Sequence, residues 1–189
     1  MNILENYYKR VIRYDLINKF NYTRLNKIPK LKKIVLNFGC KNFEIKNIAS
    51  ALFSLELIAK KRGALTKSKR SNILLKIRKG NPTGCLVILE NAEMYAFLLK
   101  LVVEIFPNLK EFRSLSISNR LGMDCFSFTL MEFINFKELE KQFYLFTDLP
   151  PLNVILITNA KSNKELLYLL HSFKLPFSIK GNCNSIGRV

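Results

Sequence analysis

The chain has 189 residues, of which 49% are apolar and 24% are charged, and its formal net charge is +17. This length fits one domain, and the apolar content supplies a hydrophobic core, which argues against an intrinsically disordered chain. Residues 1–80 hold 20 Lys and Arg against 4 Asp and Glu, whereas residues 81–189 hold 11 against 10. A compositional bias toward Lys would affect both parts, so the contrast favours a basic surface that binds a polyanion.

The first elements follow from hydrophobic periodicity. Apolar residues at helical spacing predict an amphipathic helix over residues 3–20. A connector follows, in which Pro29 cannot continue a helix. Residues 31–39 are rich in branched side chains and end at a glycine, which predicts a strand.

A second helix is expected over residues 44–62, because apolar residues again recur on one side. Three cations would occupy its last turn, where they complement the negative end of the helix dipole. Gly63 would stand just beyond the end, the usual place for glycine. The three cations are Lys60, Lys61 and Arg62.

The segment from Lys60 to Gly80 has nine Lys or Arg residues and no Asp or Glu. We expect two strands here, a third strand after them, and a glycine- and proline-containing loop as the tip of a hairpin. Such a hairpin presents its cations to phosphates while alternate apolar residues pack inward. The strands are residues 65–69, 71–79 and 85–90, the loop is 80–84, and the inward residues are Ile73, Leu75 and Ile77.

The rest of the chain mixes helices and strands without regular βαβ alternation, which predicts an α+β fold. We expect one domain over residues 1–178 and a loose tail over 179–189. A helix is expected over 91–106, capped by Asn91 and ended by Pro107, and an irregular stretch over 108–124. Strands are expected over 126–133 and 152–160, with no assignment for 136–148. A last helix is expected over 163–174, opened by a capping box of Ser162 and Glu165.

Residues able to do chemistry are sparse. The cysteines at 40, 85, 125 and 183 show no zinc-binding spacing, and we interpret them as free, mostly buried thiols in a reducing compartment. His171, the one histidine, stands among leucines on an expected helix and is a poor candidate for a general base. No nucleotide-binding or hydrolase motif occurs. We therefore predict no enzymatic activity, no cofactor and no metal site.

Two partners fit the basic segment: nucleic acid or an anionic membrane surface. Membrane binding usually needs an amphipathic helix with exposed bulky apolar residues, whereas this charge falls on an expected hairpin. No apolar stretch is long enough to span a bilayer. Composition therefore favours nucleic acid. A general basic RNA-binding protein or RNA chaperone stays open as an alternative, with an enzyme acting on RNA a more distant one.

Short sequence motifs indicate which class of nucleic-acid-binding protein this is. They are YYK at 7–9, FNY at 20–22, PKLKKIVLNFG at 29–39, LTKSKRS at 65–71, KIRKGNPTGC at 76–85, FPNLKEFRSLS at 106–116, TNAKSNKE at 158–165 and LPF at 175–177. In order and spacing they resemble ribosomal protein five, the large-subunit family that binds 5S rRNA. The resemblance implies an antiparallel sheet with helices packed on one face, a structural role in the central protuberance, and no catalysis.

The resemblance also implies partners and site residues. The partners are 5S rRNA, large-subunit rRNA, peptidyl-site tRNA, neighbouring large-subunit proteins, and a small-subunit protein reached through a bridge between the subunits. The rRNA-binding residues would be Lys33, Asn37, Lys61, Thr66, Lys67, Lys69 and Arg70. The tRNA-proximal loop would be Arg78, Lys79, Gly80 and Asn81.

Two departures from the family pattern bear on these expectations. Ile88 and Glu90 stand where the family often has a Thr and an Arg that contact 5S rRNA. A glycine-rich turn is replaced by SNRLGMDCFSF, which retains Gly122. The drifted motifs, the A/T-type composition and an N-terminus unlike a presequence favour a mitochondrion-encoded member, with a bacterial cytoplasm or a plastid as the alternative.

Overall fold

The computed structural model describes residues 2–40, 45–73, 77–109, 115–116, 124–131, 136–140, 143–146 and 149–178. Its main sheet is antiparallel and consists of β1 (Leu31–Gly39), β2 (Ala64–Lys67), β3 (Pro82–Glu90), β5 (Cys125–Leu130) and β6 (Leu152–Thr158). The strand order is β2-β3-β1-β6-β5. A separate pair of short parallel strands joins β4 (Leu115–Ser116) to β7 (Phe177–Ser178).

Helices account for most of the remaining described chain. The first helix runs without a break through α1 (Ile3–Tyr7), a π-helical turn (Tyr8–Ile12) and α2 (Arg13–Lys19). A long helix likewise joins α4 (Asn91–Lys100), a π-helical turn (Leu101–Ile105) and α5 (Phe106–Asn108). The others are a 3-10 turn (Leu25–Lys27), α3 (Ile45–Ala59), α6 (Lys137–Glu140), a second 3-10 turn (Phe143–Leu145) and α7 (Asn163–Ser172).

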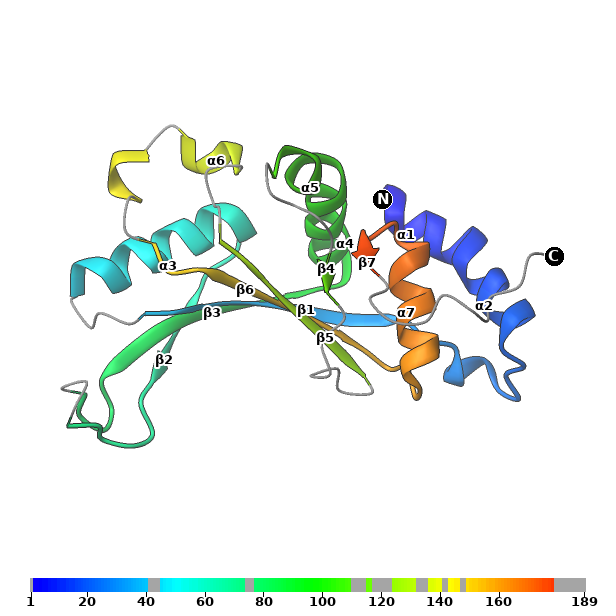
Figure 1. Ribbon diagram of the computed structural model, residues 1–189, viewed down its shortest axis with the longest axis horizontal. Coiled ribbons are helices and arrows are strands. Elements are labelled where there is room, and N and C mark those ends of the chain that lie inside the picture. The colour runs from blue at the N-terminus through cyan, green and yellow to red at the C-terminus, as the bar shows by residue number, and fades with distance from the viewer. Residues whose placement is uncertain are drawn as a thin grey trace.

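The hydrophobic core lies between the helices and one face of the sheet. On β1, Ile34, Leu36 and Phe38 are fully buried, while the residues between them are half-buried. The same alternation continues on β3, β5 and β6, because side chains on a strand point to opposite faces in turn. In Figure 1, α3, α4 and α1 lie above the sheet, which confirms the expected α+β architecture with helices on one face.

The opposite side of the sheet, the open face, is not covered by any helix that the structure describes (Figure 1). Strand register brings its residues together from four strands. They are Lys33, Val35 and Asn37 of β1, Leu86, Ile88 and Glu90 of β3, Asn153, Ile155 and Ile157 of β6, and Ser127 and Thr129 of β5.

The second helix ends earlier than expected. It stops at Ala59, and Lys60 adopts the left-handed conformation, with φ at 53°, so no cation occupies its last turn. Gly63 has another role: its N–H donates to Glu56 Oε1 at 2.8 Å, and a Cβ there would lie 2.7 Å from Leu52 Cδ1. The prediction of Gly63 as the helix terminator was wrong, because the helix ends at Ala59 and Gly63 instead lies beside the side chain of Leu52.

The expected hairpin was wrong in two places. The predicted strand over 71–79 is not formed in its described residues, where a single bridge joins Asn72 to Ile77. The predicted loop 80–84 is strand from Pro82 onward, so it is not the tip. Gly84 marks a close approach of strands, since a Cβ there would lie 2.3 Å from the carbonyl oxygen of Phe38.

Smaller corrections concern element ends. Asn91 does not cap its helix: it lies inside the first turn with φ at 49°, and Glu90 precedes it with no side-chain cap. Pro107 does not end the helix, which continues to Asn108. The stretch 108–124, expected to be irregular, contains the short strand β4. β5 covers 125–130 where a strand over 126–133 was expected, β6 ends at Thr158 and not at residue 160, and α7 ends at Ser172 and not at residue 174. Residues 132–133 and 179–189 lie outside the described residues.

The capping box was confirmed for its serine. Ser162 Oγ accepts a hydrogen bond from the N–H of Glu165 at 3.3 Å. The Glu165 carboxylate accepts from the N–H of Lys161 at 3.1 Å, one residue earlier than the usual reciprocal bond. Both bonds satisfy N–H groups that have no partner inside the helix.

Candidate nucleic-acid interface

The basic segment forms an arm, defined here as residues 67–81, between the ends of β2 and β3. Backbone bonds hold its two limbs together: Ser68 N–H donates to the carbonyl of Asn81 at 2.8 Å, and Gly80 N–H donates to that of Ser68 at 3.0 Å. Farther out, Asn72 and Ile77 exchange two bonds of 2.9 Å. Figure 1 shows the arm extending to the side opposite the helices, which is the side of the open face.

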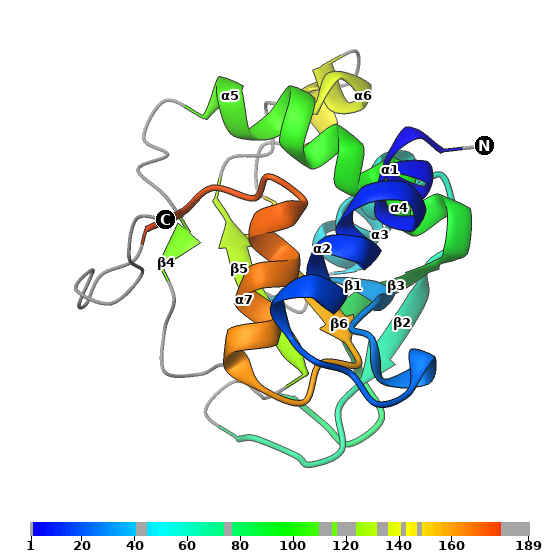
Figure 2. The same cartoon turned by 90° about the vertical axis from the view of Figure 1, so that its right-hand side faces the viewer.

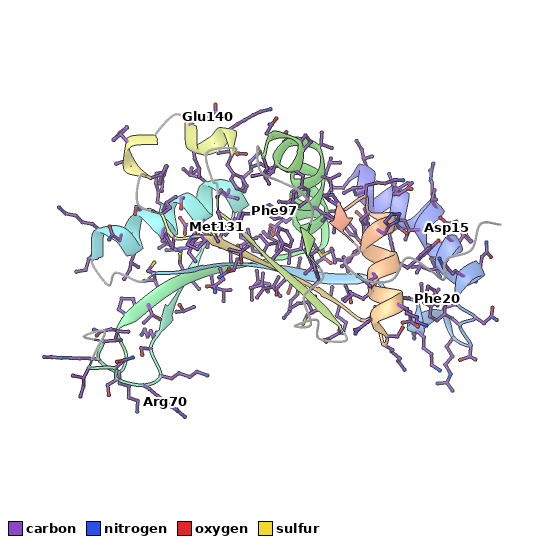
Figure 3. The ribbon with its side chains drawn as sticks, viewed as in Figure 1. Asp15, Phe20, Arg70, Phe97, Met131 and Glu140 are labelled. Atoms are coloured by element: carbon purple, nitrogen blue, oxygen red, sulfur yellow. The ribbon has the colours of Figure 1, made fainter. Side chains whose placement is uncertain are left out.

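The arm carries cations with little apolar support. Its described Lys and Arg side chains are all exposed, and none forms an ion pair with a described acid. Figure 3 places Arg70 well away from the sheet. Ile73 is 93% exposed, so its expected inward packing was wrong, and Leu75 lies outside the described residues. These cations are Lys67, Lys69, Arg70, Arg78 and Lys79.

The open face is nearly neutral by comparison. Asn37 stands on the central strand, opposite Leu86 on one side and Asn153 on the other. Thr129 Oγ1 donates to Asn153 Oδ1 at 2.8 Å, which extends a row of uncharged polar groups over three strands. This row offers amide and hydroxyl groups that can donate and accept hydrogen bonds.

The rest of the open face consists of apolar side chains and of one cation that stands opposite an acid. Val35, Ile88 and Ile155 are neighbours in register, and Ile88 is 37% exposed. Lys33 stands opposite Glu90 on the neighbouring strand, so the cation that β1 contributes to the open face stands beside an acid. The face therefore presents apolar surface between neutral polar groups and a charge-balanced pair.

The structure brings some of the predicted site residues together and separates one. Lys67, Lys69, Arg70, Arg78, Lys79, Gly80 and Asn81 all belong to the arm. Lys33 and Asn37 share the open face, and Thr66 of β2 borders it opposite Gly84. Lys61 follows α3, and its ammonium pairs with Glu93 Oε2 of α4 at 2.8 Å, toward the helices.

Sequence reasoning missed the polar row. Asn153 and Thr129 interrupt the strands LNVILIT and CFSFTL at positions that alternate with buried residues. That alternation was a usable signal, since a polar residue between buried neighbours on a strand faces outward.

Side chains able to do chemistry do not converge on this surface. Burial, followed by the nearby Cys40, raises the pKa of the Cys85 thiol to about 12. Burial also raises the pKa of Cys40, so both thiols are protonated and unreactive at neutral pH. Cys40, Cys85 and Cys125 are free, the first two are buried as expected, and Cys183 lies outside the described residues. His171 is exposed on α7.

The described residues contain neither a metal-binding cluster nor a membrane-spanning helix. There, no three His, Cys, Asp or Glu side chains gather as a metal site would require. None of the described helices combines the length and the apolar character needed to cross a membrane.

Comparison with known proteins identifies the family. Residues 82–177 match the model for the C-terminus of the ribosomal L5 family. The chain is 34% identical over 180 residues to large ribosomal subunit protein uL5m of Reclinomonas americana, covering 94% of this chain and 99% of the relative. It is 37% identical over 179 residues to uL5 of Desulforapulum autotrophicum (94% and 99%) and 32% identical over 186 residues to uL5c of Pleurastrum terricola (97% and 99%).

These matches define a structural protein of the large ribosomal subunit, not an enzyme. The chain belongs to the ribosomal L5 (uL5) family. This confirms the resemblance found in the motifs, and the antiparallel α+β sheet agrees with it.

Proposed function

We propose that this protein binds 5S rRNA in the central protuberance of the large subunit, with the open face recognising the RNA and the arm supplying charge. The observation that carries the proposal is the arm of unpaired cations beside a neutral polar face, both on the side away from the helices (Figure 1). RNA binding needs both parts, because phosphate contacts give affinity while hydrogen bonds to sugar and base edges select the site.

The open face suits a double-helical RNA. Asn37, Asn153 and Thr129 offer neutral donors and acceptors across neighbouring strands. The shallow minor groove of A-form RNA displays 2′-hydroxyls and base edges, which such groups recognise without charge. Ile88 and Glu90 are compatible with this proposal, because an apolar side chain can pack against a ribose and Lys33 stands opposite Glu90 in the strand register.

The arm's role extends to other partners. We propose that Arg78, Lys79, Gly80 and Asn81 approach peptidyl-site tRNA, since they lie on the exposed returning limb of the arm. Contacts with large-subunit rRNA, neighbouring proteins and a small-subunit protein belong to the same proposal. Gly122 and the residues around it, which bear on the bridge, lie outside the described residues.

A mitochondrial ribosome is the proposed location. The mitochondrial relative from Reclinomonas americana supports it, together with the Lys- and Asn-rich composition. Bacterial and chloroplast relatives have similar sequence identity, so a bacterial cytoplasm and a plastid are the alternative locations. Finding which genome encodes the chain would distinguish the three locations.

The experiment is retention on immobilised 5S rRNA at moderate salt, compared with an unrelated structured RNA of equal length. We expect a 1:1 complex with 5S rRNA and weaker retention on the unrelated RNA. Equal retention on both would contradict the proposal and favour a general basic RNA-binding protein or RNA chaperone.

A further inference from the structure

The outer side of α3 has an exposed apolar row. The helix packs on the core through its other side, which is buried. Residues spaced by four form one continuous row along a helix, and on the outer side of α3 each of them is apolar. We call this row the ridge, and it consists of Ile45 (84% exposed), Ala49 (exposed), Phe53 (41% exposed) and Leu57 (half-buried).

A neighbouring segment widens the ridge into an apolar patch. Phe53 stacks on the buried Phe146, with ring centroids 5.9 Å apart and 30° between the ring planes. Tyr144 and Leu145 directly precede Phe146 and are 75% and 45% exposed. Monomeric soluble proteins rarely expose apolar side chains in such a group unless the group is an interaction site.

The charge on α3 indicates that the partner is a protein. The helix has two charged residues, the exposed Lys46 and the half-buried Glu56, whose carboxylate already accepts the N–H of Gly63 at 2.8 Å. RNA and anionic lipid surfaces both require several Lys or Arg residues. A second apolar polypeptide surface is the complementary partner.

The ridge is complementary to itself. If two copies of α3 cross in opposite directions at Ala49, Ile45 of one copy meets Phe53 of the other. Rows of residues spaced by four interdigitate in the commonest class of helix packing, and a small residue at the crossing permits close approach. Lys46 would stand opposite Leu52, so the pairing brings no like charges face to face. A two-fold interface uses one surface twice in this way.

The apolar patch lies away from the proposed RNA-binding surface. In Figure 1, α3 lies above the sheet and the arm extends below it. Figure 2 gives the same relation from the end of the molecule, with the arm at the bottom and α6, which precedes the turn with Tyr144, at the top. Pairing through the ridge therefore leaves the open face and the arm accessible.

We propose that the free protein forms a two-fold dimer through the ridge, with Ala49 at the crossing point. Each copy can still bind one RNA. Stable interfaces bury about 800 Å² per partner, and the apolar patch offers about half of that, so the dimer is weak, with a Kd on the order of 10 μM. The inference goes beyond the proposed function and does not depend on it.

Salt distinguishes this dimer from RNA binding. Each copy has a formal net charge of +17, so two copies repel each other at long range. Added salt screens that repulsion, and dimerisation should strengthen as salt rises. RNA binding should weaken over the same range, because it depends on phosphate contacts.

The test is sedimentation velocity of the full chain without RNA, over concentrations on both sides of the expected Kd. Ala49→Lys places an ammonium at the crossing point. Ala96→Lys is the matched control, because Ala96 is an exposed alanine on another helix, α4. Circular dichroism verifies that each variant folds, and retention on 5S rRNA verifies that each still binds RNA.

We expect the wild type and Ala96→Lys to dimerise alike. Ala49→Lys should dimerise at least about tenfold more weakly, because like charges meet at the two-fold axis. A wild type that stays monomeric at every concentration and salt would overturn the inference, and the apolar patch would then belong to a different protein. Equal dimerisation of Ala49→Lys and the wild type would also overturn it.

A mixture of two variants tests the symmetry itself. Ala49→Lys and Ala49→Glu should each be mainly monomeric alone, whereas their mixture should dimerise, because the ammonium of one copy then lies opposite the carboxylate of the other. A mixture that stays monomeric would contradict a crossing at Ala49. Loss of dimerisation with 5S rRNA retention intact removes this inference alone, and the reverse result removes the proposed function alone.

Discussion

Lys69 and Arg70 on the arm are exposed and lie away from the sheet, whereas Asn37 on the open face is half-buried between Leu86 and Asn153. In the described residues, backbone bonds join the two limbs of the arm at Ser68 and Asn81 and at Asn72 and Ile77. The open face is formed by strands of the main sheet, and its central strand, β1, is paired on both sides. One region is charged and weakly supported, and the other is rigid and almost neutral.

The difference indicates how the two regions divide RNA recognition. Charge on a thinly supported segment attracts any phosphate backbone and adapts to it, but it selects poorly. Neutral groups on a rigid sheet attract weakly at a distance, but they require a matching surface. Affinity should therefore depend mainly on the arm, and selectivity on the open face.

Gly84, where the arm's supporting strands meet β1, gives the largest expected effect. In Gly84→Ala the new Cβ would lie 2.3 Å from the carbonyl oxygen of Phe38, a backbone atom that cannot move without disturbing the β1–β3 pairing. We expect a loss of about 3 kcal/mol in the free energy of unfolding. Calorimetry should show Tm lower by roughly 6–12 °C.

Gly39→Ala is the matched control, because nothing lies within 4 Å of a Cβ at that position. Its Tm should change little. Equal Tm values for the two variants would show that the strands separate easily there, and that the arm is not anchored as described.

Arg78→Ala with Lys79→Ala tests whether the returning limb of the arm, proposed to approach tRNA, is separable from the limb with Lys69 and Arg70, proposed to bind 5S rRNA. These side chains are exposed on the arm and support no core contact, so folding should be unaffected. We expect tRNA retention by assembled ribosomes to fall about tenfold, or about 1.4 kcal/mol, with 5S rRNA binding nearly unchanged. Filter binding measures both. A comparable loss of 5S rRNA binding would mean that both limbs of the arm serve 5S rRNA and act as one basic surface.

A third, smaller effect concerns the helical side, away from both regions. Lys100 Nζ lies 2.6 Å from Glu138 Oε2, joining α4 to α6, and both side chains are mostly buried. Burial raises the pKa of Glu138, but hydrogen bonding and attraction from Lys100 outweigh it and hold the pKa below its ordinary value. Stability from this pair is present above the unfolded pKa of the carboxyl and lost as pH falls through the folded pKa.

Glu138→Gln should therefore lower the free energy of unfolding by about 1 kcal/mol at neutral pH, and by less in acid. Urea denaturation at the two pH values measures this, and RNA binding should stay unchanged. Glu104→Gln is the control, since its 3.8 Å contact with Lys137 is more exposed and should contribute little. The pair has no role in stability if both variants unfold alike at neutral pH.

The longer helices and strands could be predicted from the sequence, because their hydrophobic periodicity matches the pattern of buried residues in the structure. β1, β6, the first helix and the Ser162 cap were predicted from periodicity and spacing. Gly63 and Gly84 misled the prediction, because glycine permits close packing as well as turns, and only the neighbouring segments show which applies. Lys60 and Asn91, with positive φ, were also beyond local rules.

The candidate nucleic-acid interface could likewise be predicted from the sequence only in part. The arm was visible as a run of cations without acids, and Asn37 entered through the family resemblance. Strand register places Asn153 beside Asn37, more than a hundred positions earlier in the chain, and Thr129 beside Asn153. The pairing of Lys61 with Glu93 depends on how α3 and α4 lie together, so the sequence could not show that its charge is partly neutralised.

The most direct test of this division is the salt dependence of 5S rRNA affinity for two variants measured beside the wild type. Asn37→Ala removes neutral contacts, so its plot of log K against log salt should lie lower and run parallel. Lys69→Ala with Arg70→Ala removes phosphate contacts, so its slope should be smaller by about 1.8 at roughly 0.9 per contact. Equal changes of slope in both variants, or none in the arm variant, would contradict the assignment of charge to the arm and selectivity to the open face.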